Sequence, residues 1–127
     1  MRYMLDTNIC IYLIKRKPLS VLNKLRAIAI SSITLAELEY GVAKSNKQTQ
    51  NNDALQEFAA PLEIMPFDDG AACRYGEIRA HLEREGKVIG GMDMLIAAHA
   101  SSLNYTLVPN NLREFERISG LLLENWL

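Results

Sequence analysis

The sequence has little cysteine, almost no net charge and no long apolar run. Cys10 and Cys73 are its two cysteines, and neither lies in a CxxC motif or a Cys/His cluster, which excludes a disulfide framework. The 14 Lys and Arg nearly balance the 15 Asp and Glu, giving a net charge of −1, whereas proteins that bind nucleic acid by bulk charge are far more basic. No stretch approaches the roughly 20 apolar residues of a membrane span, and the first residues do not resemble a signal peptide. We therefore expect a cytoplasmic protein with no membrane partner.

Sequence motifs of several common enzyme classes are also absent. There is no Walker A, GxGxxG or GxSxG pattern, so NTP-driven, dinucleotide-dependent and serine-hydrolase functions have no support. The four prolines and seven glycines are scattered rather than pooled in a linker. With 127 residues, 49% of them hydrophobic, the chain fits one domain with its own core. We expect a single domain over residues 1–127.

Short apolar runs alternate with longer segments of helical spacing. Runs rich in Ile, Leu, Val and Tyr predict buried strands, and the longer segments predict helices. Because strands separated by helices pair in parallel through right-handed crossovers, we expect an α/β fold, a three-layer α/β/α sandwich around a short parallel sheet. The predicted strands are 2–5, 27–31, 62–65, 105–108 and 121–123. The predicted helices are 9–15, 19–26, 35–44, 48–60, 70–84 and 92–101.

A few residues predict where these helices begin and end. Pro18 suits the first turn of a helix, and Thr34 with Glu37 has the T-x-x-E form of a capping box. Gly41 and Gly86 stand where helices fray or end.

Oxygen-bearing side chains follow the predicted strands. Asp6 comes directly after the first strand, Glu37 lies in the first turn of the helix after the second, and Asp93 opens a later helix. The fourth strand leads into Asn111 and Glu114. In open α/β sheets the chemistry gathers beyond the carboxyl ends of the strands, so we expect these residues at one edge of the sheet.

Each acid taken alone also has a structural interpretation. Asp6 or Asp93 would cap a helix and stabilise it by roughly 1 kcal/mol. Glu37 would close the capping box with Thr34. Taken together, the acids would repel one another: two carboxylates about 5 Å apart have a repulsion energy of roughly 3 kcal/mol at an effective dielectric near 20. A bound cation would relieve this repulsion. Oxygen ligands without a Cys or His pair select Mg²⁺ or Mn²⁺. The reaction class that follows is hydrolysis of a phosphodiester by a metal-activated water.

Four segments are distinctive: MLDTNICIYLI at 4–14, SSITLAELEYG at 31–41, IGGMDMLIAAHA at 89–100 and NNLREFERISGLLLENW at 110–126. They resemble segments of PIN domain proteins and, more narrowly, of the VapC toxins of VapBC toxin–antitoxin pairs. They occur in the family's order and spread over the whole chain. The resemblance implies a PIN fold and a divalent-metal-dependent endoribonuclease.

The resemblance also implies a role for each site residue. Asp6, Glu37 and Asp93 match the family's first three acids: Asp6 and Asp93 would hold the principal ion, and Glu37 would ligate it or orient the attacking water. Thr7 and Asn8 would support the first acid from its loop.

At the fourth position this sequence departs from the family. Many PIN domains have an aspartate where Asn111 stands, and an amide cannot supply charge, so a positioning role is implied for Asn111. Glu114 is a candidate to restore the missing carboxylate, as a further metal ligand. Pro109 stands where the family more often has threonine, which removes a hydroxyl near the site.

Partners and substrate are likewise implied by the resemblance. It implies a homodimer and a cognate VapB antitoxin whose C-terminal segment lies across the active-site groove, with a cation among the three acids. The sequence resembles the VapC proteins that cut the anticodon stem-loop of initiator tRNA. Two alternatives stay open. One is a PIN-like binding subunit without catalysis, which Asn111 allows. The other is a receiver-like phosphoacceptor domain, which the lack of a lysine after the fourth strand disfavours.

Overall fold

The computed structural model describes residues 2–16 and 28–126. At its centre is a four-stranded sheet with the strand order β3-β2-β1-β4, in which every neighbouring pair is parallel. Met4 of β1 lies opposite Ala29 of β2 and Leu107 of β4. The strands are β1 (Tyr3–Leu5), β2 (Ile28–Ser31), β3 (Glu63–Met65) and β4 (Thr106–Val108).

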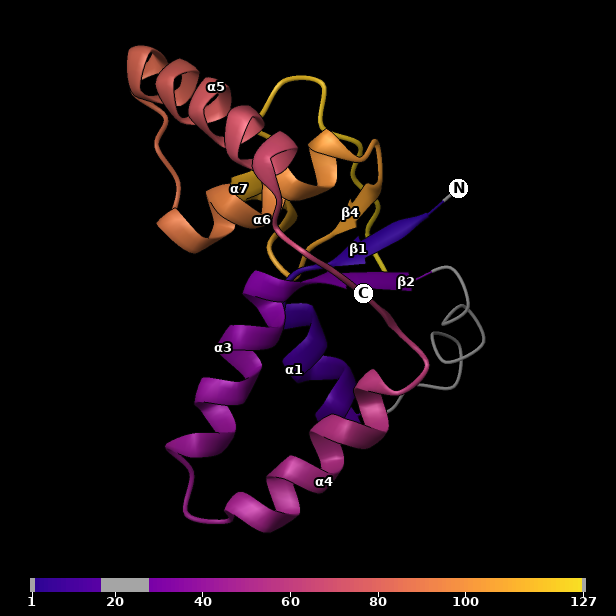
Figure 1. Ribbon diagram of the computed structural model, residues 1–127. Coiled ribbons are helices and arrows are strands. Elements are labelled where there is room, and N and C mark those ends of the chain that lie inside the picture. The colour runs from indigo at the N-terminus through magenta and orange to yellow at the C-terminus, as the bar shows by residue number, and fades with distance from the viewer. Residues whose placement is uncertain (1, 17–27, 127) are drawn as a thin grey trace.

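Helices cover both faces of this sheet, as Figure 1 shows, so the predicted α/β/α sandwich is confirmed. One layer consists of α1 (Thr7–Arg16), α3 (Ser32–Ala43) and α4 (Gln48–Ala59). The other consists of α5 (Asp69–Glu85), α6 (Gly91–Ser102) and the short α7 (Leu112–Phe115). Within the described ranges, no helix has the length and apolar character needed to cross a membrane.

Alternate residues of the central strands build two separate cores. Met4 and Leu107 face the layer of α5 and α6, whereas Leu5 and Val108 face the layer of α1, α3 and α4. All four side chains are fully buried. Because neighbouring residues of a strand point to opposite faces, this alternation holds a helix layer on each side.

The predicted fifth strand at 121–123 is wrong. That segment runs beside β4, where the Leu107 N–H donates to the Leu122 carbonyl (2.9 Å) and the Glu124 N–H donates to the Leu107 carbonyl (3.1 Å). These bonds make a single parallel bridge between Leu107 and Leu123 rather than a ladder. The segment therefore covers the edge of β4 without extending the sheet by a strand.

Two helices begin two or three residues earlier than predicted, because a residue at the end of the preceding strand or directly after it caps each of them. α1 begins at Thr7 rather than at 9, since the Asp6 carboxylate accepts a hydrogen bond from the Ile9 N–H (2.7 Å). α3 begins at Ser32, and its cap is Ser31, whose hydroxyl accepts from the Ile33 N–H (3.0 Å). The predicted capping box is therefore wrong, because Thr34 already lies within the helix.

Glycine serves as a helix terminator at one of the two predicted positions. Gly86 adopts a left-handed conformation (φ 68°) and ends α5, as expected. Gly41 lies inside α3, so that prediction is wrong. The predicted helix 19–26, Pro18 and residue 27 lie outside the described residues. α7 was not predicted as a helix.

A buried histidine joins α6 to the sheet. His99 of α6 is 1% exposed, and its Nδ1 lies 2.8 Å from the hydroxyl of Ser31. The ring also forms a hydrogen bond with the backbone of Pro66, whose nitrogen carries no hydrogen, so His99 donates to the carbonyl. Nδ1 is then left to accept from Ser31. Burial lowers the pKa of His99, which is consistent with a neutral ring in this position.

Replacing Ser31 by alanine should therefore destabilise the fold. Ser31→Ala removes the cap of α3 and leaves the buried Nδ1 of His99 unpaired, so we expect a loss of about 2 kcal/mol in the free energy of unfolding. Urea denaturation measures it. Ser119→Ala is the control, because Ser119 is exposed. If Ser31→Ala, like Ser119→Ala, changed the free energy of unfolding by no more than about 0.5 kcal/mol, the role of Ser31 as a cap and as the partner of His99 would be contradicted.

Candidate active site

The site forms where the parallel strands end. β1 leads into Asp6, β2 leads into α3, and β4 leads into Pro109 and Asn110. Because β1 pairs with both β2 and β4, these three ends meet at the same edge of the sheet. This is the edge that the sequence analysis predicted for the chemistry.

Asp6 is the most buried acid of this edge, at 2% exposure. One carboxylate oxygen accepts the Ile9 N–H of α1, and the other accepts the Asn110 N–H after β4 at 3.1 Å. Burial raises the pKa of Asp6, the two backbone bonds lower it, and the nearby charges of Glu37 and Glu114 raise it further. Asp6 is thus a helix cap and a member of the site at once.

Glu37 reaches the site from the second turn of α3 rather than from the first, because the helix begins at Ser32. The Thr7 hydroxyl donates to its carboxylate (2.5 Å) and lies 3.5 Å from the hydroxyl of Thr34. Thr7 therefore fixes the direction of Glu37. Asn8 is exposed, and among the described residues its side chain has no hydrogen-bond partner.

Asp93 and Glu114 form the second half of the site. Asp93 lies in the first turn of α6, but the cap of that helix is Gly90, so the N-cap interpretation of Asp93 is wrong. Burial raises the pKa of Asp93 to about 6, with further contributions from the charges of Glu114, Asp6 and Glu37 and from a hydrogen bond with Glu114. Asp93 therefore keeps its proton to a higher pH than an ordinary aspartate does.

Glu114 is joined to this region through the backbone. Its carboxylate accepts the Gly90 N–H at 3.1 Å. A Cβ at Gly90 would stand 3.4 Å from an oxygen of Asp93 and 3.9 Å from an oxygen of Glu114, so Gly90 lies directly beside both carboxylates.

Asn111 occupies a different place from Glu114. It precedes α7, is exposed, and makes no side-chain capping bond. The neighbouring Asn110 contacts Asp6, and it does so through its backbone N–H. Of the two candidates for the fourth position, Glu114 interacts electrostatically with Asp6 and Asp93.

We call Asp6, Glu37, Asp93 and Glu114 the acidic cluster. Within the described ranges, no three Asp, Glu, His or Cys side chains converge closely enough to hold a metal ion in common. The donors are nevertheless all carboxylate oxygens, which suit a hard divalent ion, and Mg²⁺ keeps several waters while binding one or two carboxylates directly. The donor set therefore fits a hydrated Mg²⁺ or Mn²⁺ rather than a fully caged ion.

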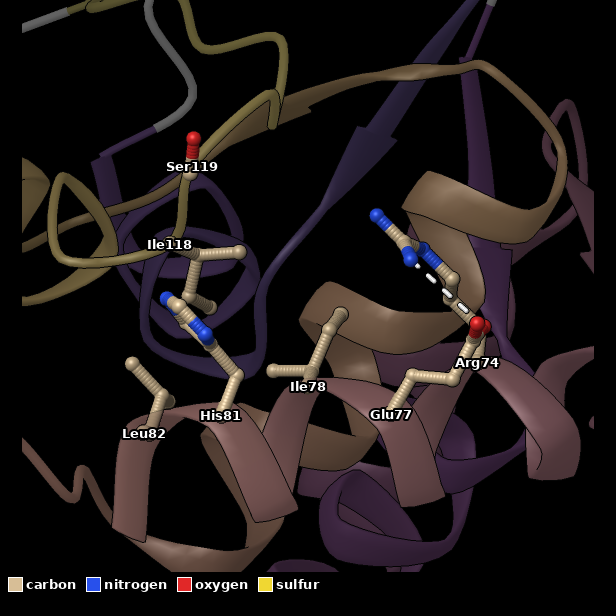
Figure 2. Close-up of a pocket in the computed structure, with 7 residues that line it drawn as sticks. All are labelled: Arg74, Glu77, Ile78, His81, Leu82, Ile118 and Ser119. Carbon is tan, nitrogen blue, oxygen red and sulfur yellow. Dashed lines mark hydrogen bonds and ion pairs between the residues drawn. The ribbon is translucent and has the colours of Figure 1, made fainter. Parts of the chain in front are cut away.

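A separate hollow of about 250 Å³ lies between α5 and the turn after α7, and Figure 2 shows its lining. Ile78, Leu82 and Ile118 form its apolar part, and Arg74 at its rim lies 3.5 Å from Glu77. No member of the acidic cluster lines it. This hollow is therefore not part of the candidate active site.

The burial of Asp93 and the charge repulsion within the acidic cluster should together lower the stability of the fold by a measurable amount. The pKa of Asp93 is about 6 in the fold against 3.8 for an ordinary aspartate, so the folded state loses stability as pH rises through this window. In EDTA at pH 7, Asp93→Asn should raise stability by about 1 kcal/mol after allowance for solvent screening, or about 4 °C in Tm.

The pH dependence separates repulsion from a capping role. The gain from Asp93→Asn should shrink as the pH falls from 7 to 4, because Asp93 is then protonated in the fold. Thermal melts at both pH values measure it, with Asp53→Asn on exposed α4 as a matched control. A clear loss of Tm at pH 7 would contradict the repulsion.

Comparisons with known proteins agree with this geometry. The model of the PIN domain family matches residues 3–121. The chain is 52% identical to Ribonuclease VapC2 of Rickettsia felis, and the alignment covers 99% of this chain and 98% of that protein. It is 43% identical to the tRNA(fMet)-specific endonuclease VapC of Shigella flexneri, with the same coverage of the two chains. It superposes on the crystal structure of VapBC2 from Rickettsia felis bound to a promoter DNA fragment with a TM-score of 0.94, 51% identity and complete coverage of both chains. The chain therefore belongs to the PIN domain family and, within it, to the VapC ribonucleases, the toxins of VapBC toxin–antitoxin systems.

Proposed function

We propose that this ribonuclease is a divalent-metal-dependent endonuclease, and that the acidic cluster is its catalytic and metal-binding site. The observation that carries the proposal is that four acids from separate parts of the chain influence one another: burial is the largest cause of the raised pKa of Asp93, and the charges of Glu114, Asp6 and Glu37 raise it further. Such repulsion is unfavourable without a cation. PIN-domain ribonucleases are generally metal-dependent, which supports the same conclusion.

Asp6 and Asp93 would hold the principal Mg²⁺ or Mn²⁺, with Glu114 as a further ligand. When bound, the ion supplies a Lewis acid that polarises the phosphate and makes water more acidic. Two backbone N–H groups fix the Asp6 carboxylate before any ion arrives. The Thr7 hydroxyl likewise fixes Glu37, whose free oxygen is then available to orient the attacking water.

The remaining predicted site residues would act at the margin of the cluster. Thr7 is a positioning residue for Glu37. Asn8 would support the loop after β1, and Asn111 would position substrate or water through its amide. We further propose that residues 1–127 form a single PIN domain.

The proposed substrate is initiator tRNA, cut in its anticodon stem-loop. Support comes from two relatives described as tRNA(fMet)-specific endonuclease VapC, from Shigella flexneri and Salmonella typhimurium, which are 43% and 46% identical to this chain over nearly its whole length. A protein of net charge −1 would select such an RNA by its shape and a few local contacts.

The proposed partner is a VapB-type antitoxin. Solved structures of relatives contain VapBC complexes, from Rickettsia felis and Salmonella typhimurium. In this chain, a groove of about 310 Å³ between α1, α3 and α4 is lined by apolar residues such as Ile11, Leu38 and Leu55, and Glu37 stands at its edge. An antitoxin segment in this groove would bring a cationic side chain to the acidic cluster. A homodimer and a cytoplasmic location remain predictions.

Family membership argues against both alternatives from the sequence. A non-catalytic binding subunit and a receiver-like phosphoacceptor domain have no counterpart among the ribonucleases that this chain matches. In addition, β4 leads into Pro109 and two asparagines rather than into a lysine.

Cleavage of tRNA by antitoxin-free protein tests the proposal. With Mg²⁺ or Mn²⁺ we expect one discrete product from initiator tRNA, which disappears in EDTA. Asp93→Asn should lower the rate about a hundredfold or more, because it removes a proposed metal ligand. Asp53→Asn removes the same charge from exposed α4 and should cleave normally. Wild-type rates for Asp93→Asn, or for the wild type in EDTA, would refute the assignment.

Two further variants test whether Glu114 or Asn111 takes the fourth position of the site. Glu114→Gln should lower the cleavage rate about tenfold and raise the Mg²⁺ concentration needed for half-maximal rate, because the carboxylate charge beside Asp93 is lost. Asn111→Ala should leave the Mg²⁺ requirement unchanged, since its side chain makes no capping bond and carries no charge. The reverse pattern would assign the fourth position to Asn111.

A further inference from the structure

A basic hollow lies beside the acidic cluster. It has a volume of about 470 Å³ and is lined by Gly86, Lys87, Arg113, Glu116 and Arg117, so that three basic side chains face one acidic side chain. Because the chain as a whole carries a net charge of −1, this local excess of positive charge is not a property of the general surface. An anion is therefore the ligand that the hollow favours.

The two segments that form the basic hollow also form the second half of the active site. The turn after α5 leads from Gly86 to Gly90, and the Gly90 N–H is bound by Glu114 of α7. On the other side of this link, Arg117 donates to the Val88 carbonyl at 3.1 Å. These two bonds hold α7 and the residues directly after it against the turn, so the lining of the basic hollow is joined to the acidic cluster.

Lys87 and Arg113 are the basic side chains free to bind a ligand there. Neither forms an ion pair or a side-chain hydrogen bond with any residue that the structure describes. Arg74, in the hollow of Figure 2, differs because it is bound to Glu77 and Ser101. Arg117 holds the turn through Val88 and therefore has a structural role as well.

The backbone that carries Lys87 is well fixed. Gly86 ends α5 in the left-handed conformation, and the Lys87 N–H donates to the Leu82 carbonyl at 2.9 Å. Arg113 lies on α7, directly before Glu114. A phosphate held between these two residues would thus stand at a fixed place relative to the acidic cluster.

We propose that Lys87 and Arg113 bind backbone phosphates of the RNA substrate next to the bond that is cleaved. This proposal rests on the proposed function, because it takes RNA as the substrate and the acidic cluster as the place of cleavage. Phosphate contacts of this kind position a nucleic acid without reading its sequence. They would give a protein without bulk positive charge the affinity it needs for RNA.

The test is the double variant Lys87→Ala with Arg113→Ala, assayed on initiator tRNA. We expect KM to rise about tenfold with kcat unchanged, since two phosphate contacts are lost but the acidic cluster is intact. The slope of log affinity against log salt should become less steep by about 1.4, the value for two single-stranded contacts. Lys44→Ala with Lys47→Ala is the matched control, because both residues are exposed and lie at the α3–α4 turn, far from α7 in Figure 1.

A binding assay separates this inference from the proposed function. Asp93→Asn protein, with and without the double variant, is titrated in EDTA into a labelled anticodon stem-loop, so that no cleavage is required. A salt slope that depends on Lys87 and Arg113 supports the inference even if the wild type cleaves no tRNA. Unchanged KM and salt slope overturn it. A variant that binds RNA normally but is poorly inhibited by the antitoxin also overturns it, because the hollow would then bind an acidic peptide segment.

Discussion

The fold and the candidate site both depend on the hydrogen bonds of one buried carboxylate. Asp6 accepts one backbone N–H from Ile9 in the first turn of α1 and another from Asn110 after β4, which is 104 residues further along the chain than Asp6. These bonds compensate the burial of the charge, which by itself raises the pKa of Asp6. The Asp6 side chain therefore caps α1 and joins the end of β1 to the loop after β4. The same bonds hold its carboxylate in place within the acidic cluster.

Around Asp6, the structure holds like charges together by bonds to neutral groups. Thr7 binds Glu37, and the Gly90 N–H binds Glu114, so neither carboxylate is neutralised by a lysine or arginine among the described residues. Burial and the repulsion that remains together raise the pKa of Asp93. A metal ion and an antitoxin cation would relieve the same repulsion, so these two ligands should compete for the cluster.

The sequence was sufficient to predict the sheet and the edge at which the acids meet. Buried strands are strongly apolar here, and parallel pairing brings their carboxyl ends together without any knowledge of side-chain contacts. Asp6 was predictable for this reason, since it directly follows β1. The beginning of α3 was not, because Ser31 caps the helix while still belonging to β2, and the T-x-x-E pattern of Thr34 and Glu37 imitates a cap one turn later.

Other features escaped prediction because they depend on contacts between distant segments. The bond from the Gly90 N–H to Glu114 spans 24 residues, and α7 has four residues, too few to show a helical period. The segment 121–123 has the composition of a strand, but it pairs with β4 at one residue alone. In both cases the structure of the segment depends on a contact with a distant part of the chain, which local composition does not reveal.

Helix α7 places opposite charges on adjacent residues with different surroundings. Glu114 joins the acidic cluster through Gly90, whereas Arg113 lines the basic hollow with Lys87. Because adjacent residues of a helix point in different directions, one turn of helix can serve a metal site and a phosphate site without the two charges pairing. An RNA bound in the basic hollow would then have one phosphate held by cations while the next approaches the acidic cluster. Since phosphate alone would be repelled by the four carboxylates, productive binding at the cluster requires the divalent ion, and the basic hollow supplies affinity that does not depend on it.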